Sequence, residues 1–407
     1  MNFVIVGNSA AGIAAAENLR NLEPQAKITI ISEENHPPYA RCLIAEVVAG
    51  SASLDSIRYR ADSFYKDRNI RLIRGVRVNS IDPAGRVVSC GDQGEFSYDR
   101  LLLATGSRPV TLDIDGAGLK GVFVLRSYDQ AVTIARHAAG VKEAVVIGGG
   151  LIGLKAAYAL RQRGLPVTVV VKSKHILTRQ LNDYSAGLVE AELREAGINF
   201  IFGQNPEAFT FGPGGKALRS VVLEDGQELP AGLALVAKGV IPNAGLAREA
   251  GGDTAAGIKV NAFMETSLPG VYAAGDCIEV QDCVTGRQTP SALWTLAVEQ
   301  GRYAAYNMAG RRKAYPPPLT RLNAAQFGKL PFISVGAVDE GEEYLTWQGA
   351  VGHYRMLAVR EDRLVGCIMV GSIEQGGVYT SLIKSKRPLG DLRNDILKGR
   401  IPAANLV

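Results

Sequence analysis

The chain lacks paired cysteines. Its five cysteines are scattered over 407 residues and include no CxxC pair: Cys42, Cys90, Cys277, Cys283 and Cys367. This spacing argues against a disulfide framework and against the usual iron–sulfur and zinc sites. We therefore expect no bound metal.

Long apolar runs are also lacking, since none reaches the roughly 18–20 residues that a membrane-crossing helix needs. The N-terminus shows no signal peptide, because Met1-Asn2-Phe3 leads directly into an apolar segment without a basic region. We expect a cytoplasmic protein without a membrane span.

The chain has no large excess of positive or negative charge. The formal net charge is +5 with 21% charged residues, and no Lys/Arg run suggests nucleic-acid binding. The 47% hydrophobic content is that of a globular protein, and the length suggests two or three domains.

Against these absences, one arrangement occurs twice. An apolar run of the buried parallel-strand type is followed at once by a glycine-rich turn, an Ala-rich helix and a second β-branched strand. The first copy comprises residues 2–6, 7–20 and 28–31, and the second comprises residues 144–147, 148–164 and 167–171. Two such βαβ units predict two nucleotide-binding folds.

The glycine turns, GNSAAG at 7–12 and GGGLIG at 148–153, follow the GxGxxG pattern in the strand–turn–helix context that it requires. Glycine lets the backbone approach a pyrophosphate, and the helix N-terminus presents free N–H groups to it. The first copy departs from the pattern, because Ser9 replaces the middle glycine.

The remaining segments predict smaller elements. Residues 70–82 and 86–90 suggest short antiparallel strands inserted into the first nucleotide fold. Residues 215–240 show the same alternating pattern after the second βαβ unit. Residues 316–407 combine alternating stretches with a helix near 376–386, which indicates a small α+β domain.

Two further strings, LLLATGSRP (101–109) and TSLPGVYAAGD (266–276), complete a resemblance to the two-dinucleotide pyridine nucleotide-disulfide oxidoreductase family. HPPYARCL (36–43) and TRQLN (178–182) look most like rubredoxin reductases and the flavin part of bacterial nitrite reductases. The resemblance implies an α/β fold with two Rossmann-like, glutathione-reductase-like domains and a small α+β C-terminal domain. The implied domains are FAD-binding (1–110 and 241–315), NAD(P)H-binding (111–240) and C-terminal interface (316–407).

The resemblance also implies cofactor contacts. The first turn would hold the FAD pyrophosphate, Glu33 or its neighbour Glu34 the adenosine ribose, and Asp276 the ribityl and phosphate region. The expected FAD contacts are Gly7, Ser9, Ala10, Ala11, Gly12, Glu33, Glu34, Arg41, Val78, Ala104, Thr105, Gly106, Arg108, Gly275, Asp276 and Trp294. The expected nicotinamide-nucleotide contacts are Gly148, Gly150, Leu151, Ile152, Gly153, Lys172 and Gly239.

The choice of nicotinamide nucleotide stays open. An acidic residue at the end of the second strand would favour NAD, but Val171 is followed here by Lys172, Ser173 and Lys174. These lysines favour a 2′-phosphate, whereas the family resemblance favours NADH. We expect NAD(P)H, with NADH slightly ahead.

Three residues are candidates for chemistry at the flavin. Cys42 follows Arg41 and, if a helix begins there, lies in its first turn, where a thiolate is favoured. Glu46 and Lys155 carry charges opposite to those usual in relatives, and would pair near the reactive edge of the flavin. A small buried cysteine and two unrelated surface charges are the structural alternatives.

These features predict an FAD-dependent NAD(P)H oxidoreductase. Its electrons would pass to an iron–sulfur protein such as rubredoxin or ferredoxin, or it would be the flavin subunit of a larger redox complex. The alternative is a self-contained NADH oxidase, peroxidase or CoA-disulfide-type reductase that uses Cys42. A third possibility is a flavoprotein used for binding or signalling. Partner subunits or a homodimer would fit each of these.

Overall fold

The computed structural model describes residues 1–212 and 214–400, which form two compact units. The first unit comprises residues 1–42, 54–108 and 240–320, and the second comprises the described residues within 43–53, 109–239 and 321–400. Each unit contains one of the two βαβ copies. The assignment of domains by cofactor stays a prediction.

The first unit is built on a five-stranded parallel sheet with the order β19-β7-β1-β2-β3. Its strands are β1 (Asn2–Val6), β2 (Lys27–Ser32), β3 (Arg71–Arg74), β7 (Arg100–Leu103) and β19 (Val271–Ala273). Helix α1 (Ala10–Leu22) packs against α8 (Trp294–Met308) so closely that a Cβ on Gly301 would lie 2.2 Å from the Ala11 carbonyl oxygen.

Smaller elements complete this unit. An antiparallel sheet joins β4 (Ser80–Asp82), β5 (Val87–Ser89) and β6 (Glu95–Ser97), as expected for the inserted strands. The expectation was wrong for residues 71–74, because β3 instead extends the main sheet as a parallel partner of β2. The other elements are α3 (Phe64–Asp67), β8 (Ser107–Pro109), β17 (Val240–Pro242), α7 (Gly245–Glu249), β18 (Ile258–Lys259), β20 (Ile278–Gln281) and β21 (Gln288–Pro290).

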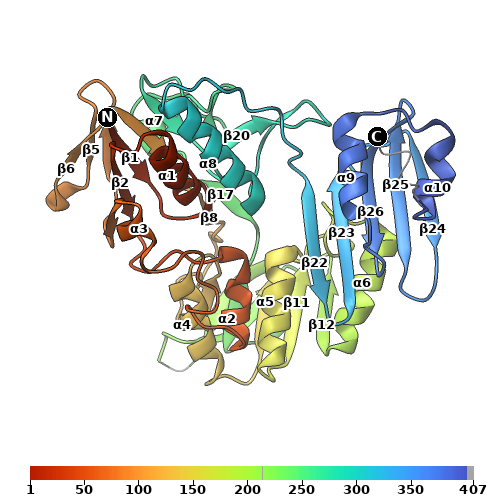
Figure 1. The fold of residues 1–407 in the computed structure, drawn as a ribbon. Helices are drawn as coiled ribbons and strands as arrows, with labels where there is room; N and C mark the ends of the chain where they lie inside the picture. Colours follow the sequence, from red (N-terminus) through yellow and green to blue (C-terminus); the bar gives the residue numbers. More distant parts are fainter. Residues whose placement is uncertain (213, 401–407) are drawn as a thin grey trace. The chain divides into compact units, whose positions relative to one another are not determined.

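The second unit contains its own parallel sheet, with the order β12-β11-β10-β16-β9. The strands are β9 (Val122–Val124), β10 (Ala144–Ile147), β11 (Val167–Val171), β12 (Ile198–Phe202) and β16 (Leu233–Val236). Helix α2 (Ile44–Ala49) lies beside α5 (Leu151–Gln162) and α4 (Tyr128–Ala138) (Figure 1). Helix α6 is Asp183–Glu195, and an antiparallel sheet joins β13 (Pro206–Phe211), β14 (Leu218–Leu223) and β15 (Glu228–Pro230).

The C-terminal part of the second unit is an antiparallel sheet with the order β22-β23-β26-β25-β24, against which helix α9 packs. Its middle strand β26 buries all but its first residue. The bounds are β22 (Leu322–Phe327), β23 (Leu330–Gly336), β24 (Glu343–Gln348), β25 (Tyr354–Arg360), β26 (Arg363–Val370), α9 (Gly376–Ser385) and α10 (Arg393–Leu397). The alternating stretches and the helix near 376–386 are confirmed.

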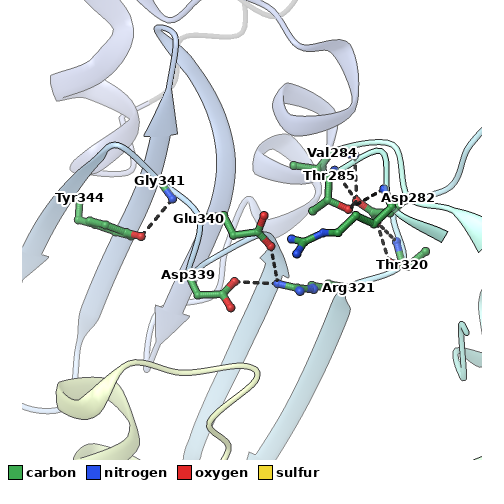
Figure 2. Close-up of polar contacts among 10 residues, drawn as sticks. Asp282, Val284, Thr285, Thr320, Arg321, Asp339, Glu340, Gly341 and Tyr344 are labelled. Atoms are coloured by element: carbon green, nitrogen blue, oxygen red, sulfur yellow. Dashed lines mark hydrogen bonds and ion pairs between the residues drawn. The ribbon is translucent and has the colours of Figure 1, made fainter. Parts of the chain in front are cut away.

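The chain passes from the first unit to the second for the last time between Thr320 and Arg321, and each of these residues is fixed within its own unit. In the first unit, Thr320 donates its N–H (2.9 Å) and its hydroxyl (2.6 Å) to the buried carboxylate of Asp282 (Figure 2). In the second, Arg321 forms ion pairs with Asp339 at 2.7 Å and Glu340 at 3.4 Å (Figure 2). The α/β fold with two glycine-turn units is confirmed. Over the described ranges, no helix has both the length and the apolar character to cross a membrane.

Candidate functional site

The first candidate site lies at the carboxyl edge of the parallel sheet in the first unit. Four neighbouring strands, β19, β7, β1 and β2, end there, and a loop with predicted site residues follows each of them. In open parallel α/β sheets, ligands bind at this edge. The fold thus gathers at one edge residues that are far apart in the sequence.

The glycine turn after β1 is closely packed. Gly7 has a φ of +119°, and a Cβ on it would lie 2.1 Å from the Ala104 carbonyl oxygen. A Cβ on Gly12 would lie 2.0 Å from the Gly7 carbonyl oxygen. Ser9 is the N-cap of α1, but its side chain makes no capping hydrogen bond. The turn therefore needs its glycines and leaves the first N–H groups of α1 available to an anion.

The two candidate ribose carboxylates differ in their surroundings. Glu34 accepts hydrogen bonds from the Tyr39 hydroxyl and from Arg41, both at 2.5 Å. Glu33 is 69% exposed, and its one ion pair among the described residues is with Arg77 at 3.5 Å. Glu33 is thus the carboxylate with oxygens available to a ribose, while Glu34 binds Arg41.

Arg41 is largely buried beside this edge. Burial lowers the pKa of Arg41, but the charge of Glu34 and its hydrogen bond outweigh that effect and leave the pKa above its ordinary value. The charge of Asp276 acts in the same direction. Arg41 therefore keeps its positive charge near the carboxylates of Glu34 and Asp276.

The loops after β7 and β19 are tied to their neighbours. Ser107 Oγ donates to Asp276 at 3.0 Å. Thr105 and Asn243 exchange two hydrogen bonds, from Thr105 Oγ1 to the Asn243 carbonyl at 2.7 Å and from Asn243 Nδ2 to the Thr105 carbonyl at 2.9 Å. These bonds fix the loop backbone where the chain leaves β7.

Helix α8 contributes a buried amide to the same edge. The Gln300 side-chain oxygen accepts the Gly275 N–H at 2.9 Å, while Gln300 Nε2 has no partner among the described residues. Helical apolar spacing over residues 289–305 predicts a helix with Pro290 near its start, whereas α8 begins at Trp294, because Pro290 belongs to β21. Trp294 packs edge-on against Tyr59 with ring centroids 5.0 Å apart.

The second candidate site is the carboxyl edge of the sheet in the second unit. Gly148 has a φ of +123°, and a Cβ on it would lie 2.4 Å from the Ala237 carbonyl oxygen. A Cβ on Gly153 would lie 2.1 Å from the Gly148 carbonyl oxygen. Gly150, the N-cap of α5, has no atom within 4 Å of its Cβ position. The turn is closed on its inner side and open in front of the helix N-terminus, which fits a pyrophosphate.

The three residues predicted for chemistry occupy different elements. Cys42 lies in the short 3-10 helix Arg41–Leu43, ahead of α2, and is the exposed one among five free cysteines. Glu46 is on α2 and accepts a hydrogen bond from Ser51 Oγ at 2.9 Å. Lys155 is on α5, which packs beside α2. Within the described ranges Glu46 and Lys155 form no ion pair, and their catalytic role stays a prediction.

The other predicted contacts are distributed over both units. Arg108, in β8, donates to Asn243 Oδ1 at 3.4 Å, and Val78 is buried. Leu151 and Ile152 open α5, and Gly239 follows β16. Sequence reasoning missed Asn243, Gln300 and Lys238. Asn243 follows the apolar run Val240-Ile241-Pro242, but its partner Thr105 is 138 residues away, so no local pattern revealed the pairing.

Comparisons with known proteins agree with this architecture. Residues 1–301 match the family model of the pyridine nucleotide-disulphide oxidoreductases, and residues 318–387 match that of the rubredoxin NAD+ reductase C-terminal domain. An NADH oxidase of Methanocaldococcus jannaschii is 35% identical over 78% of this chain and 72% of its own length. A rubredoxin-NAD(+) reductase of Pseudomonas putida is 32% identical over 78% of this chain and 82% of its own length.

A solved structure covers nearly the whole chain. The covalent putidaredoxin reductase–putidaredoxin complex contains a chain with a TM-score of 0.91 and 28% identity, over 99% of both chains. The chain spans about half the length of two Bacillus subtilis relatives, 49% of an assimilatory nitrate reductase electron transfer subunit and 48% of a nitrite reductase. On the match over residues 1–301, the chain belongs to the pyridine nucleotide-disulphide oxidoreductases, a family of FAD-dependent enzymes that use NAD(P)H.

Proposed function

We propose that the protein takes hydride from NAD(P)H onto FAD and passes the electrons to a separate iron–sulfur protein, such as a rubredoxin or a ferredoxin. FAD would supply the redox chemistry, and the protein would supply binding, orientation and electrostatics. The observation that carries the proposal is the occurrence of two carboxyl sheet edges with the same closed glycine turn.

The first edge is the proposed FAD site. The N–H groups at the start of α1 would bind the pyrophosphate, and Glu33 would accept the ribose hydroxyls. Asp276, held by Ser107, would bind the ribityl region. Gly7, Ala10, Ala11, Gly12, Ala104 and Gly106 would let the backbone approach the cofactor. Trp294 and Tyr59 would pack at the flavin end.

The second edge is the proposed NAD(P)H site, with the start of α5 facing the pyrophosphate. Accordingly, we propose that residues 1–110 and 241–315 bind FAD, that residues 111–240 bind NAD(P)H, and that residues 316–407 form an interface. We also propose a cytoplasmic location. All five cysteines are free thiols, the state that the reducing cytoplasm maintains.

The iron–sulfur acceptor is supported by the C-terminal match to rubredoxin reductases and by the similarity to putidaredoxin reductase. The net charge of +5 favours an acidic protein partner.

A second candidate function rests on Cys42. It is the one exposed cysteine, and it directly follows Arg41, whose positive charge would favour a thiolate. Similarity to an NADH oxidase, and at 28% identity and a TM-score of 0.89 to a persulfide reductase of A. fulgidus, supports a thiol-based reductase or oxidase.

Steady-state turnover distinguishes the two functions. With NADH or NADPH as the donor, we expect the FAD-loaded protein to reduce rubredoxin or ferredoxin, and the Cys42→Ser variant to keep that activity. Failure with every such carrier, together with Cys42-dependent turnover of oxygen, peroxide or a disulfide, would replace the first function by the second.

A further inference from the structure

We infer that the nicotinamide site is built for a phosphorylated adenosine ribose, so that the donor is NADPH, with Lys172 and Lys238 as the phosphate-binding residues. This inference rests on the proposed function and runs against the slight preference for NADH that the family resemblance implies.

The two edges correspond residue for residue. In the first unit, β1 ends at Val6, which pairs with Ile31, and the following Gly7 N–H donates to the Ile31 carbonyl at 2.9 Å. In the second unit, β10 ends at Ile147, which pairs with Val170, and the Gly148 N–H donates to the Val170 carbonyl at 2.9 Å. The strand register therefore aligns Ile31 with Val170, and two positions further on it aligns Glu33 with Lys172.

The third strand of each edge extends the correspondence. Val6 pairs with Leu103, and Ile147 pairs with Val236. The next residues, Ala104 and Ala237, each donate their N–H at 2.8 Å to the strand that precedes the glycine turn, and each lies under that turn. The sequence Ala104-Thr105-Gly106 thus aligns with Ala237-Lys238-Gly239, which places Lys238 at the position of Thr105.

Both differences make the second edge more positive. At the position shared by Glu33 and Lys172, the carboxylate of Glu33 can accept hydrogen bonds from the two free hydroxyls of an unphosphorylated ribose, such as the one in FAD. Its replacement by Lys172 removes that acceptor pair and supplies a cation instead. Lys172 is exposed and forms no ion pair with a described residue, so its charge is available to a ligand.

The second lysine reaches the same strand end. Lys238 Nζ donates to Asn205 Oδ1 at 2.6 Å, and the adjacent Gln204 N–H lies 3.4 Å from the carbonyl oxygen of Val171, the last residue of β11. Burial lowers the pKa of Lys238, the charge of Lys172 lowers it further, and Glu224 acts in the opposite direction. Two mutually repelling ammonium groups therefore lie where the adenosine ribose is expected, and a phosphate would stabilise both.

Calorimetric binding to the FAD-loaded protein tests this site without turnover. The probes are 2′,5′-ADP and 5′-AMP, which differ only in the 2′-phosphate. We expect 2′,5′-ADP to bind on the order of 10- to 100-fold more tightly, as one or two charge-assisted hydrogen bonds would give. Lys172→Glu and Lys238→Thr, which introduce the residues of the first edge, should remove most of this difference.

Lys142→Glu is the matched control, because Lys142 is an exposed lysine just before the amino end of β10 and should leave the difference unchanged. Equal affinities for the two probes in the native protein would overturn the inference. Tighter binding of 3′,5′-ADP than of 2′,5′-ADP would also overturn it, because the site would then fit the 3′-phosphate of coenzyme A.

Rapid anaerobic reduction of the flavin separates this inference from the proposed function. Faster reduction at low NADPH than at equal NADH, reversed in Lys172→Glu, supports NADPH as the donor. Preference of the native protein for NADH overturns the inference but leaves the proposed function intact. No flavin reduction by either nucleotide would refute the proposed function itself, whatever the binding of the probes.

Discussion

Glu33 and Glu34 are neighbours in the sequence, yet the fold gives their carboxylates different surroundings. Glu34 binds Tyr39 and Arg41, whereas Glu33 remains largely exposed at the end of β2. Their position directly after β2 predicts that one of the two residues contacts a ribose. It does not predict which of them, because that depends on Tyr39 and Arg41 folding back toward the strand.

Near the passage from the first unit to the second at Thr320–Arg321, the carboxylate of Asp282 accepts more hydrogen bonds than any other carboxylate drawn in Figure 2. It accepts the N–H groups of Val284, Thr285 and Thr320 and the hydroxyls of Thr285 and Thr320 (Figure 2). Replacement by Ala leaves these donors unpaired, which costs on the order of 3 kcal/mol of unfolding free energy. We expect Asp282→Ala to lower the melting temperature of the FAD-loaded protein by several degrees.

The same residue predicts a pH dependence. Burial raises the pKa of Asp282, but the hydrogen bonds from Thr320, Thr285 and Val284 outweigh it and hold the pKa below its ordinary value of 3.8. A carboxyl with a depressed folded-state pKa stabilises the fold above the unfolded pKa, and loses that contribution as the pH falls through the folded pKa. The difference in melting temperature between the native protein and Asp282→Ala should be largest above about pH 4 and should become smaller below it.

Asp225→Ala is the matched control for this measurement. Asp225 accepts the Gln227 N–H at 3.0 Å in an exposed turn, so its loss should change the melting temperature little at any pH. Equal effects of the two variants would show that the Asp282 contacts do not stabilise the protein.

At the residue scale, the sequence predicted the charged and glycine positions at strand ends, because those positions follow from the βαβ pattern. It did not predict the partners that hold them. Asp276 and Ser107 are 169 residues apart, and Gln300 reaches Gly275, in the loop after β19, from helix α8. Such pairs arise only when the strands are ordered in the sheet, which no local pattern fixes.

At the scale of elements, the two glycine turns are equivalent, and each serves its own unit. A Cβ on Gly12 or on Gly153 would lie 2.0 or 2.1 Å from a carbonyl oxygen of its own turn, so the helix would have to move away from the strand. Such a shift displaces the N–H groups that would bind pyrophosphate, at a cost of roughly 1–3 kcal/mol. The two substitutions to Ala should therefore have separable effects.

We expect Gly12→Ala to purify with little FAD, and Gly153→Ala to stay yellow but to need roughly 10- to 100-fold more NADPH for flavin reduction. Gly187→Ala is the control, because Gly187 is exposed within α6 and has nothing near its Cβ position. It should leave both cofactor functions unchanged and stabilise the helix slightly. Loss of FAD from Gly153→Ala with retention by Gly12→Ala would reverse the assignment of the two edges.

The elements that the sequence predicted best are those with a strong period. Both βαβ units and the helix at Gly376–Ser385 follow from apolar spacing. Two predictions were less accurate. Residues 71–74 join the parallel sheet as a partner of β2. The sequence did not reveal this pairing, because β2 lies about forty positions earlier in the chain. Helix α8 begins at Trp294, because residues 288–290 pair with β20 as a strand.

At the scale of the whole molecule, each of the two units carries one parallel sheet with a glycine turn at its carboxyl edge, and the five cysteines are free. The proposed function assigns to these edges a two-electron donor and a flavin, and it leaves the acceptor to another protein. Whether Cys42 stores electrons decides between this account and a self-contained thiol enzyme. The sequence could not decide it, because the segment combines a cysteine with flanking residues typical of rubredoxin reductases.

The most direct test is an anaerobic titration of the FAD-loaded protein with NADPH and then with NADH, in parallel with Cys42→Ser. The account predicts that native protein and variant take up equal reducing equivalents, no more than the flavin alone can hold, and that oxidised ferredoxin or rubredoxin then reoxidises both. Additional equivalents in the native protein that disappear in Cys42→Ser would contradict it, because Cys42 would then be a redox centre.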